Sequence, residues 1–515
     1  MQLLDLYLPD YRGLGEFRLD FSNARDICVL VGRNGRGKSR MLHALVEIFG
    51  TLSRSTRASF GYRVRYTRSG HLVEIVQEKS SSMPVMKLSI EGPAEAIIRR
   101  PDWRLYLPDH VFGYQSVKDS AWDIEFEIHA EEDRAASRGI GRRFNEAAVD
   151  SELGLRSLFQ CDTNQLPLIL LSLLPNWSDH FARHAEEVGV LGFASADLTI
   201  HRPVWAKGSR YVNLPYWGLQ GYSRVLFDRI ASMGRFGAIP TRDDPSNFPE
   251  FRISISTYAD LEVFLGLFQS DATMFATLER LASAGILTAD VRLTMSGGFQ
   301  ITPGDLSSGE QQMLTVMGLL RLQRGEESLF LLDEPASHFH PGWSQRWFSS
   351  VSEMLEDGQK SQFVAATHDP ALVSNIPQQQ LRILRSPVPG TVVAEVPSID
   401  PRGYGIGNLL TSELYGLTSQ LDDATRDLID EQYELVGRGQ LGEEDLAKLG
   451  EVNATLDSLG FATTRRDPVV SLFLAELDRR RKALLERASG ANPPTQEELA
   501  SLVARLFDER LTRGL

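Results

Sequence analysis

The alternation of apolar and polar residues near the N-terminus predicts β-strands that lead into a buried strand. Residues 2–8 and 17–21 follow the two-residue period of half-buried strands, with a glycine-containing turn between them. Residues 27–31 form a continuous apolar run, which is typical of a strand buried on both faces of a parallel sheet. A Gly-rich loop follows at 32–39, and residues 41–49 then show helical spacing. The pattern predicts strand, loop and helix in succession.

The rest of the chain divides into stretches of different pattern. Residues 60–115 favour further strands, residues 116–300 are mixed and largely helical, and residues 301–400 return to α/β character. Beyond 401 the chain is charged and helical, and Thr495 with Glu498 predicts the capped start of a last helix. We therefore predict an α/β fold with four parts, namely an N-terminal core part at 1–115, a mostly helical insertion at 116–300, a C-terminal core part at 301–400 and a helical domain at 401–515.

Composition narrows the class of protein. The 515 residues carry a formal net charge of −14, so non-specific coating of nucleic acid is not expected, although a local basic groove stays compatible with the sequence. The two cysteines, Cys28 and Cys161, allow neither a disulfide framework nor a CxxC metal site. No secretory signal is visible, and no apolar run approaches the ~20 residues that cross a bilayer. We expect a cytoplasmic protein with no membrane segment.

The Gly-rich loop has the spacing of a phosphate-binding loop. Residues 32–39, Gly-Arg-Asn-Gly-Arg-Gly-Lys-Ser, fit the pattern G-x-x-x-x-G-K-[ST]. Glycines let backbone N–H groups approach phosphate, and the following helix start adds positive potential. Lys38 is expected to reach the β- and γ-phosphates and Ser39 to ligate Mg²⁺. A plain Gly/Arg surface turn is the alternative, and the predicted strand and helix on either side argue against it.

A second apolar run ends in two acids. Residues 329–332 precede Asp333 and Glu334, and ligand sites of α/β proteins lie at the carboxyl ends of parallel strands. Asp333 is expected to hold Mg²⁺, and Glu334 to polarise the attacking water. Solvated carboxylates at a strand end are the alternative interpretation.

Residues 306–312, Leu-Ser-Ser-Gly-Glu-Gln-Gln, precede an apolar helix at 313–322. Small residues at a helix start form an anion-binding nest, in which Ser307 caps the helix and donates to a phosphate. A plain capping box of Ser307 with Glu310 explains the same residues, and that alternative stays open.

Two more predicted strands end in polar side chains. His368 follows residues 363–367 and is a candidate for contact with the γ-phosphate or the attacking water. Gln115 ends residues 111–115 and is a candidate sensor of Mg²⁺ and γ-phosphate. Each is also explained as an ordinary polar residue at a strand end. The functional roles of His368 and Gln115 are therefore predicted mainly from the neighbouring motifs.

Several charged residues attract a simpler interpretation. Arg33, Arg36 and Arg40 could act as transition-state cations, but we expect at least two of them to be solvated or paired. His338 and His340 have no acidic partners in sequence and are weak evidence for a metal. We interpret residues 336–341 as a loop that meets a partner protomer, and the basic run 479–482 as a solvated helix face.

Four motifs of ABC-type ATPases are matched in their usual order. Walker A matches residues 32–39, the signature 306–312, Walker B 329–335 and the switch histidine 367–368. With residues 11–17 before them, the chain resembles the soluble branch that includes RecF and SMC proteins and the OLD-like and Septu-like ATPases of anti-phage defence. The resemblance implies a two-lobed ATPase core of mixed and parallel sheet, ATP and Mg²⁺ as cofactors, and a head-to-tail homodimer that closes around ATP. It implies nucleotide binding by Gly32, Asn34, Gly35, Gly37, Lys38, Ser39, Ser307, Ser308, Gly309 and Glu310, metal binding by Ser39, Asp333 and Gln115, and hydrolysis by Glu334, His368 and Gln115.

Departures from the family refine this resemblance. Ser308 stands where transporter signatures usually have Gly, which is closer to the soluble branch, and the insertion lacks the sustained heptads of a long coiled coil. No strands with the Glu and Asp-x-Asp of a Toprim nuclease are visible after residue 400. The chain therefore resembles the ATPase of a two-component defence system that controls a separate effector such as a nuclease. A RecF-like DNA clamp and a self-contained nuclease with its site in the insertion stay open, as do contact with DNA or RNA and assembly beyond a dimer. A transporter subunit fits least.

Overall fold

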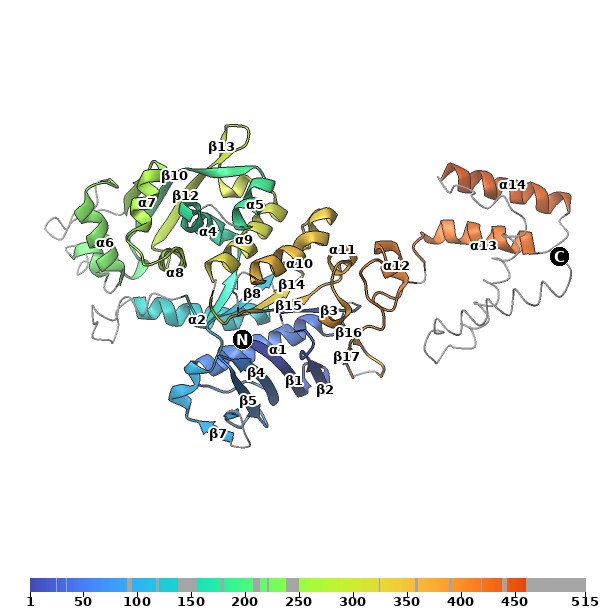
Figure 1. Cartoon of the computed structure of the whole chain (residues 1–515), viewed down its shortest axis with the longest axis horizontal. Helices are drawn as coiled ribbons and strands as arrows, with labels where there is room; N and C mark the ends of the chain where they lie inside the picture. Colours follow the sequence, from blue (N-terminus) through green and yellow to red (C-terminus); the bar gives the residue numbers. More distant parts are fainter. Residues whose placement is uncertain are drawn as a thin grey trace. The chain divides into compact units, whose positions relative to one another are not determined.

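The computed structural model describes most of the first 459 residues (Figure 1). The described ranges are 1–24, 26–33, 35–89, 95–116, 120–137, 155–176, 180–206, 214–219, 222–237, 250–323, 325–356, 360–388, 391–417, 419–437 and 442–459. The predicted last helix and the basic run at 479–482 lie outside them. Contacts divide the chain into a unit of Met1–Gly416 and a unit of Leu417–Leu515. The boundaries predicted at 115, 300 and 400 stay a prediction.

A seven-stranded, mostly parallel sheet forms the centre of the first unit. Its order is β17-β16-β3-β15-β14-β8-β9, and only β17 runs antiparallel to its neighbour. All five residues of β3 and of β15 are buried, as the apolar run at 27–31 predicted for β3. The strands are β3 (Ile27–Val31), β8 (Val111–Gln115), β9 (Leu158–Cys161), β14 (Leu329–Asp333), β15 (Gln362–Ala366), β16 (Leu381–Arg385) and β17 (Val393–Glu395).

Helix α1 (Lys38–Ser53) packs on the central sheet with one side, and an antiparallel sheet of six strands covers its other side. The order of that sheet is β2-β1-β4-β5-β6-β7. Figure 1 shows α1 between these strands and the central sheet, and one hydrophobic cluster joins α1 to both. The two sheets therefore fix α1, and with it the loop that precedes it. The strands are β1 (Gln2–Tyr11), β2 (Leu14–Asp20), β4 (Tyr62–Arg68), β5 (His71–Gln77), β6 (Val85–Ser89) and β7 (Glu95–Ile98).

The insertion contains the expected helices and also a four-stranded antiparallel sheet that the pattern did not predict. The sheet order is β11-β10-β12-β13, with β10 (Val190–His201), β11 (Glu250–Ile255), β12 (Leu287–Met295) and β13 (Gln300–Ile301). Ala196, Leu198 and Ile200 alternate into the core, but two register shifts interrupt the pairing of β10 with β12 before them. Bulges of this kind break the two-residue period, which explains why the strand was missed. "Largely helical" is therefore corrected to mixed for the described part of the insertion.

Helices of the insertion pack around this sheet and extend to the central one. They are α2 (Ser120–Ser137), α4 (Leu166–Leu173), α5 (His180–Glu187), α6 (Tyr222–Met233), α7 (Tyr258–Leu265) and α8 (Asp271–Ser283). The longest apolar run of this region forms α4, in which every residue except Pro167 is buried. In the part of the chain that the structure describes, no helix combines the length and apolarity required to span a membrane.

Four helices of the first unit belong to the C-terminal core part or follow it, namely α9 (Ser308–Leu322), α10 (Pro341–Glu356), α11 (Pro370–Val373) and α12 (Ile406–Thr411). In the second unit, α13 (Asp423–Gly437) and α14 (Glu443–Ser458) pack as a pair. Leu435, Val452 and Leu456 are the buried apolar side chains of that pair. The helical prediction for residues beyond 401 is thus confirmed where the structure describes them.

Candidate functional site

The predicted acids and Gln115 lie on one edge of the central sheet. Asp333, the last residue of β14, pairs in register with Gln115 of β8 and with Ala366 of β15. Glu334 and His368 follow these strand ends directly. Because the carboxyl ends of parallel strands face the same edge, residues from three separated motifs meet there. Strand β3, next to β15, delivers the Gly-rich loop to the same edge.

The Gly-rich loop is shaped by close approach of its backbone to neighbouring strands. Gly32 has φ +153°, and a Cβ there would lie 2.7 Å from the carbonyl oxygen of Leu384. Helix α1 then begins without a side-chain cap, because its N-cap residue is Gly37. The first N–H groups of α1 are therefore left for an anion. Asn34, predicted to bind nucleotide, lies outside the described residues.

Lys38 is held inside this loop. Its side chain is 7% exposed, and Nζ donates to the carbonyl oxygen of Gly32 at 2.7 Å. Burial lowers the pKa of Lys38, whereas the carboxylates of Glu334 and Asp333 act against that change. The ammonium group is thus a poorly solvated cation that feels the charge of two carboxylates. A bound phosphate would add a hydrogen-bonding anion in place of the hydration that burial removes.

Glu334 has an unusual backbone and a direct link to His368. Its φ is +53°, a left-handed conformation that a non-glycine residue rarely adopts. One carboxylate oxygen lies 2.7 Å from Nδ1 of His368, and the other accepts from Oγ1 of Thr367 at 3.2 Å. Strained residues of this kind cluster at functional sites, where the surrounding structure enforces them. The carboxylate is oriented by two groups from the end of β15.

Gln115 contacts a residue that the sequence did not single out. Its Nε2 lies 3.3 Å from Nε2 of His43 in α1, and His43 in turn packs against Trp122 of α2, with ring centroids 5.2 Å apart. This chain of contacts joins the edge residue to the first helix of the insertion. His43 carries no pattern that distinguishes it from other polar residues on a helix, so only the tertiary structure identifies it.

The signature residues form the start of α9. Ser307 is its N-cap, and Ser307 and Glu310 make both hydrogen bonds of a capping box, so the simpler interpretation of these residues is realised. Ser307 and Ser308 are exposed, whereas Gly309 is buried with its Cβ position 2.5 Å from the carbonyl oxygen of His338. Gln312 is buried and donates to the carbonyl oxygen of Pro335. The start of α9 is thereby fixed against the loop after β14.

Two of the remaining arginines make contacts within the chain. Arg40 donates to the carbonyl oxygen of Arg12, and Arg33 donates to that of Gly416, so both are engaged within the chain. His338 and His340 are exposed in the loop before α10. Among the described residues, no group of three or more His, Cys, Asp or Glu side chains could hold a metal ion.

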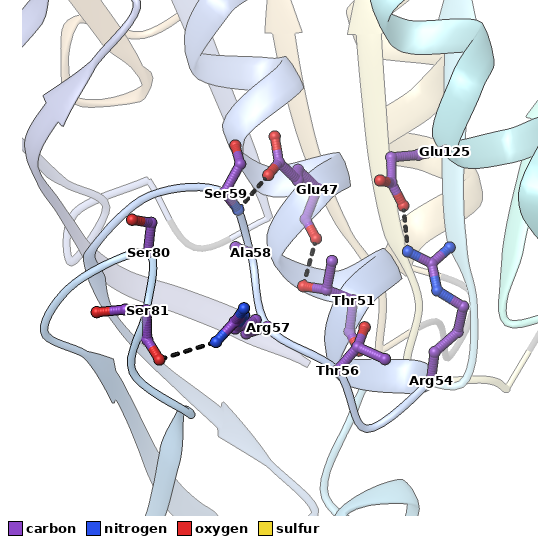
Figure 2. Close-up of a pocket in the computed structure, with 10 residues that line it drawn as sticks. All are labelled: Glu47, Thr51, Arg54, Thr56, Arg57, Ala58, Ser59, Ser80, Ser81 and Glu125. Atoms are coloured by element: carbon purple, nitrogen blue, oxygen red, sulfur yellow. Dashed lines mark hydrogen bonds and ion pairs between the residues drawn. The ribbon is translucent and has the colours of Figure 1, made fainter.

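A polar pocket of about 550 Å³ lies at the opposite end of α1 from the Gly-rich loop (Figure 2). Its charged residues make contacts within the protein, since Arg54 pairs with Glu125 at 2.9 Å and Glu47 accepts from the backbone N–H of Ser59 at 2.6 Å. Arg57 donates to the carbonyl oxygen of Ser81. These contacts tie the end of α1 to α2 and to the following loops, and the pocket is separate from the edge described above.

Two family models match the sequence. Residues 1–84 match a family described as "AAA domain", and residues 224–374 match one described as "AAA domain, putative AbiEii toxin, Type IV TA system". Both matched regions are therefore similar to AAA-family domains. Between them the matches include the phosphate loop, the start of α9, both edge acids and His368. The family resemblance inferred from the motifs is confirmed at this level.

Two curated relatives align with parts of the chain. The Septu protein PtuA of Bacillus mycoides (strain KBAB4) is 25% identical over 175 residues, which cover 32% of this chain and 24% of that protein. Protein ea59 of Escherichia phage lambda is 31% identical over 111 residues, covering 21% of this chain and 20% of that protein. The chain therefore spans about a quarter or less of the length of the curated relatives that it matches.

Solved structures of SMC heads show a distant likeness. The SMC head domain from Thermotoga maritima is 14% identical with a TM-score of 0.33, and the match covers 78% of this chain and all of that one. A Pyrococcus furiosus Smc head, solved with an extended coiled coil and bound to the C-terminal domain of ScpA, is 12% identical with a TM-score of 0.35, covering 76% of this chain and 96% of that one. TM-scores this low carry no argument about the fold, which is therefore described from the strands and helices of this chain alone.

Proposed function

We propose that this protein is a dimeric ATP-hydrolysing switch of ABC type that regulates a separate effector, such as a nuclease, in a two-component anti-phage defence system. The AAA-type ATPase domain supports ATP chemistry in general. The partial match to a Septu protein supports the defence role. The specific reaction, the dimer and the effector are the proposal.

One observation carries the hydrolytic part. Lys38, Asp333, Glu334 and His368 come from three separated motifs, and the sheet brings them to one edge, where Glu334 and His368 lie 2.7 Å apart. Hydrolysis of a phosphoanhydride requires a cation that binds phosphate, a carboxylate that binds the metal and a base that is correctly oriented. Residues that met at this edge by chance would not be expected to include a buried lysine such as Lys38 or a left-handed backbone such as that of Glu334.

Each residue has a distinct task in the proposed reaction. Lys38 and the uncapped N–H groups of α1 bind the phosphates. Ser39 and Asp333 would hold Mg²⁺, which neutralises charge on phosphate oxygens when bound. Glu334 orients the attacking water and accepts its proton, while His368 holds that carboxylate and reaches toward the terminal phosphate. Gln115, held by His43, is placed to report the occupancy of this edge to α2.

The dimer follows from the exposed start of α9. Ser307 and Ser308 present hydroxyl groups at a helix N-terminus on the surface of the unit, and we propose that they close over the γ-phosphate bound by a second protomer. Two such sites would form head to tail. ATP would then favour the closed dimer, and hydrolysis would release it, which is a population shift that an effector can sense.

The proposed function is tested with the purified chain and with cells. Steady-state phosphate release should depend on ATP and Mg²⁺, and light scattering should show a dimer with a slowly hydrolysed ATP analogue. In a host that carries the chain with its neighbouring gene, plating efficiency of phage should fall. Glu334→Gln or deletion of the neighbouring gene should restore it.

Other outcomes would redirect the proposal. Salt-sensitive, ATP-dependent DNA binding without any effector would favour the RecF-like clamp. Mg²⁺-dependent cleavage of DNA or RNA by the chain alone would favour the self-contained nuclease. Absence of ATP hydrolysis by the intact chain together with its neighbour would refute the ATPase switch.

A further inference from the structure

The loop that follows β14 carries the proposed catalytic acid and is held from two sides. On one side, the N–H of Glu334 donates to the carbonyl oxygen of Ala366 at 2.9 Å, and its carboxylate accepts from Thr367 at the end of β15. On the other side, the first turns of α9 lie against the carbonyl groups of Pro335 and His338. The acid is therefore located between the end of one strand and the start of one helix.

The backbone of Glu334 is unfavourable for the dipeptide that contains it. Steric contact with a proline ring favours an extended conformation in the residue that precedes it. Glu334 precedes Pro335 and yet has φ +53°, in the left-handed region that also disfavours any residue with a Cβ. The local sequence thus opposes this conformation, so contacts from other segments have to maintain it.

The side chain of Gln312 supplies one such contact from inside the protein. It is 1% exposed, and its Nε2 donates to the carbonyl oxygen of Pro335, the residue directly after the acid. A proline carbonyl can only accept, so the amide nitrogen of Gln312 has to face it. Its Oε1 is buried and has no hydrogen-bond partner in the described part of the chain. Among the described residues, the bond to Pro335 is therefore what compensates burial of the amide.

An apolar side chain would fill the position of Gln312 at less cost. Its neighbours Met313 and Leu314 are buried apolar residues of the same helix. Burial of an amide whose oxygen stays unsatisfied is unfavourable compared with burial of an apolar side chain of similar length. Three residues earlier on the same face of α9 is Gly309, where a Cβ would lie 2.5 Å from the carbonyl oxygen of His338. Two residues of one helix face are thus fitted to one loop.

We infer that Gln312 is a positioning residue for Glu334, and that its bond to the carbonyl oxygen of Pro335 holds the acid in its left-handed conformation. Without that bond, the backbone of Glu334 relaxes toward the extended conformation that the following proline favours. The carboxylate then leaves His368, whose Nδ1 lies 2.7 Å from it, and the attacking water loses its oriented base. The inference rests on the proposed hydrolysis at this edge.

The first test is Gln312→Met in the full chain, because methionine keeps the length of the side chain and removes the donor. We expect kcat for ATP hydrolysis to fall by about tenfold with KM for ATP within twofold, because the acid acts on the attacking water and not on the bound nucleotide. A general loss of folded protein would not change the Kd for ATP of the folded fraction or the position of the acid. Gln323→Met, at a buried glutamine at the other end of α9, is the matched control and should change neither kcat nor KM.

A double-mutant cycle then tests whether Gln312 acts through Glu334. In Glu334→Gln the base is already absent, so addition of Gln312→Met should change the residual turnover by less than about twofold. If Gln312 contributed to catalysis by another route, the loss seen in the wild-type background would appear again in the Glu334→Gln background.

The outcomes separate this inference from the proposed function. Unchanged kcat in a folded Gln312→Met protein, with active wild type, would overturn the role of Gln312, and so would equal losses in the two backgrounds. A wild type without ATP hydrolysis would refute the proposed function instead. If Gln312→Met does not fold, Gln312→Asn, whose amide is one methylene shorter, is measured in the same way, and the same results decide.

Discussion

The starts of α1 and α9 were both predicted to bind phosphate, yet the structure builds them differently. Helix α1 begins at Gly37, which offers no side chain, so its first N–H groups have no partner from a cap. Helix α9 begins at Ser307, and its capping box already satisfies the N–H groups of Ser307 and Glu310. The first can therefore accept an anion without displacing a capping side chain. At the second, a phosphate competes with groups of the protein itself.

This difference fits a division of labour in the proposed dimer. A loop that must hold ATP on each protomer benefits from donors that are always available. A helix start that meets ATP only when a partner arrives benefits from a cap that keeps it folded in the meantime. Dimerisation then becomes sensitive to a small free-energy difference, as a reversible switch requires.

The largest effect is expected from removing the charge of the α1 site. Lys38→Ala should weaken ATP binding more than 100-fold, because it removes the buried ammonium that we propose pairs with the phosphates. Isothermal titration with ATP and Mg²⁺ measures this. Lys448→Ala, a change of the same type in the second unit, should bind ATP as the wild type does. Tight binding by Lys38→Ala would refute the phosphate role of the loop.

Glu334→Gln should separate binding from hydrolysis. The amide keeps the size of the side chain but cannot accept a proton from water, so turnover should fall by at least 100-fold while ATP binding stays within threefold. The variant should accumulate as an ATP-bound dimer in light scattering. Glu353→Gln, at an exposed carboxylate of α10, serves as the control. Normal turnover in Glu334→Gln would contradict the assignment.

Ser307→Ala tests the proposed phosphate contact at the start of α9. Loss of the cap should lower the free energy of unfolding by about 1 kcal/mol, measured with urea. The ATP-dependent dimer should weaken at least tenfold more than this loss explains, with ATP binding to the monomer unchanged. Thr257→Ala removes the matching capping box of α7 and should affect stability alone. Equal dimerisation by the two variants would leave the start of α9 with only its capping role.

The smallest expected effect is a change with pH in the free energy of unfolding, and it depends on a contact at the C-terminal end of α1. At its far end, Gly50 contributes a carbonyl oxygen that lies 3.1 Å from Nε2 of His129 in α2, and burial lowers the pKa of His129 to about 4. Because this value lies below that of an unfolded His, stability should fall as pH drops below about 6.5, by roughly 0.5–1 kcal/mol between pH 7 and pH 6. Urea unfolding at both values measures the change. His129→Gln should flatten it, and an identical slope in that variant would refute the assignment.

Much of the fold was predictable because local patterns agree with it. The apolar run at 27–31 matches β3, and the further strands expected within residues 60–115 include β4 and β5. The sheet of the insertion was not predictable, because bulges in β10 disturb the period on which strand prediction depends. His43 was missed for another reason. Its contacts come from chain segments far away in sequence, and it belongs to no motif.

The sequence by itself determined that the chain has a phosphate loop, a strand that ends in two acids and a helix start rich in small residues, because each depends on residue types at fixed spacing. The order of the strands was decided only in the tertiary structure, where pairing of β14 with β8 and β15 brings Asp333, Gln115 and the end of β15 together. The pairing of Glu334 with His368 and the contact of Arg33 with Gly416 were decided there too. Such contacts depend on packing between distant segments, which no local pattern encodes.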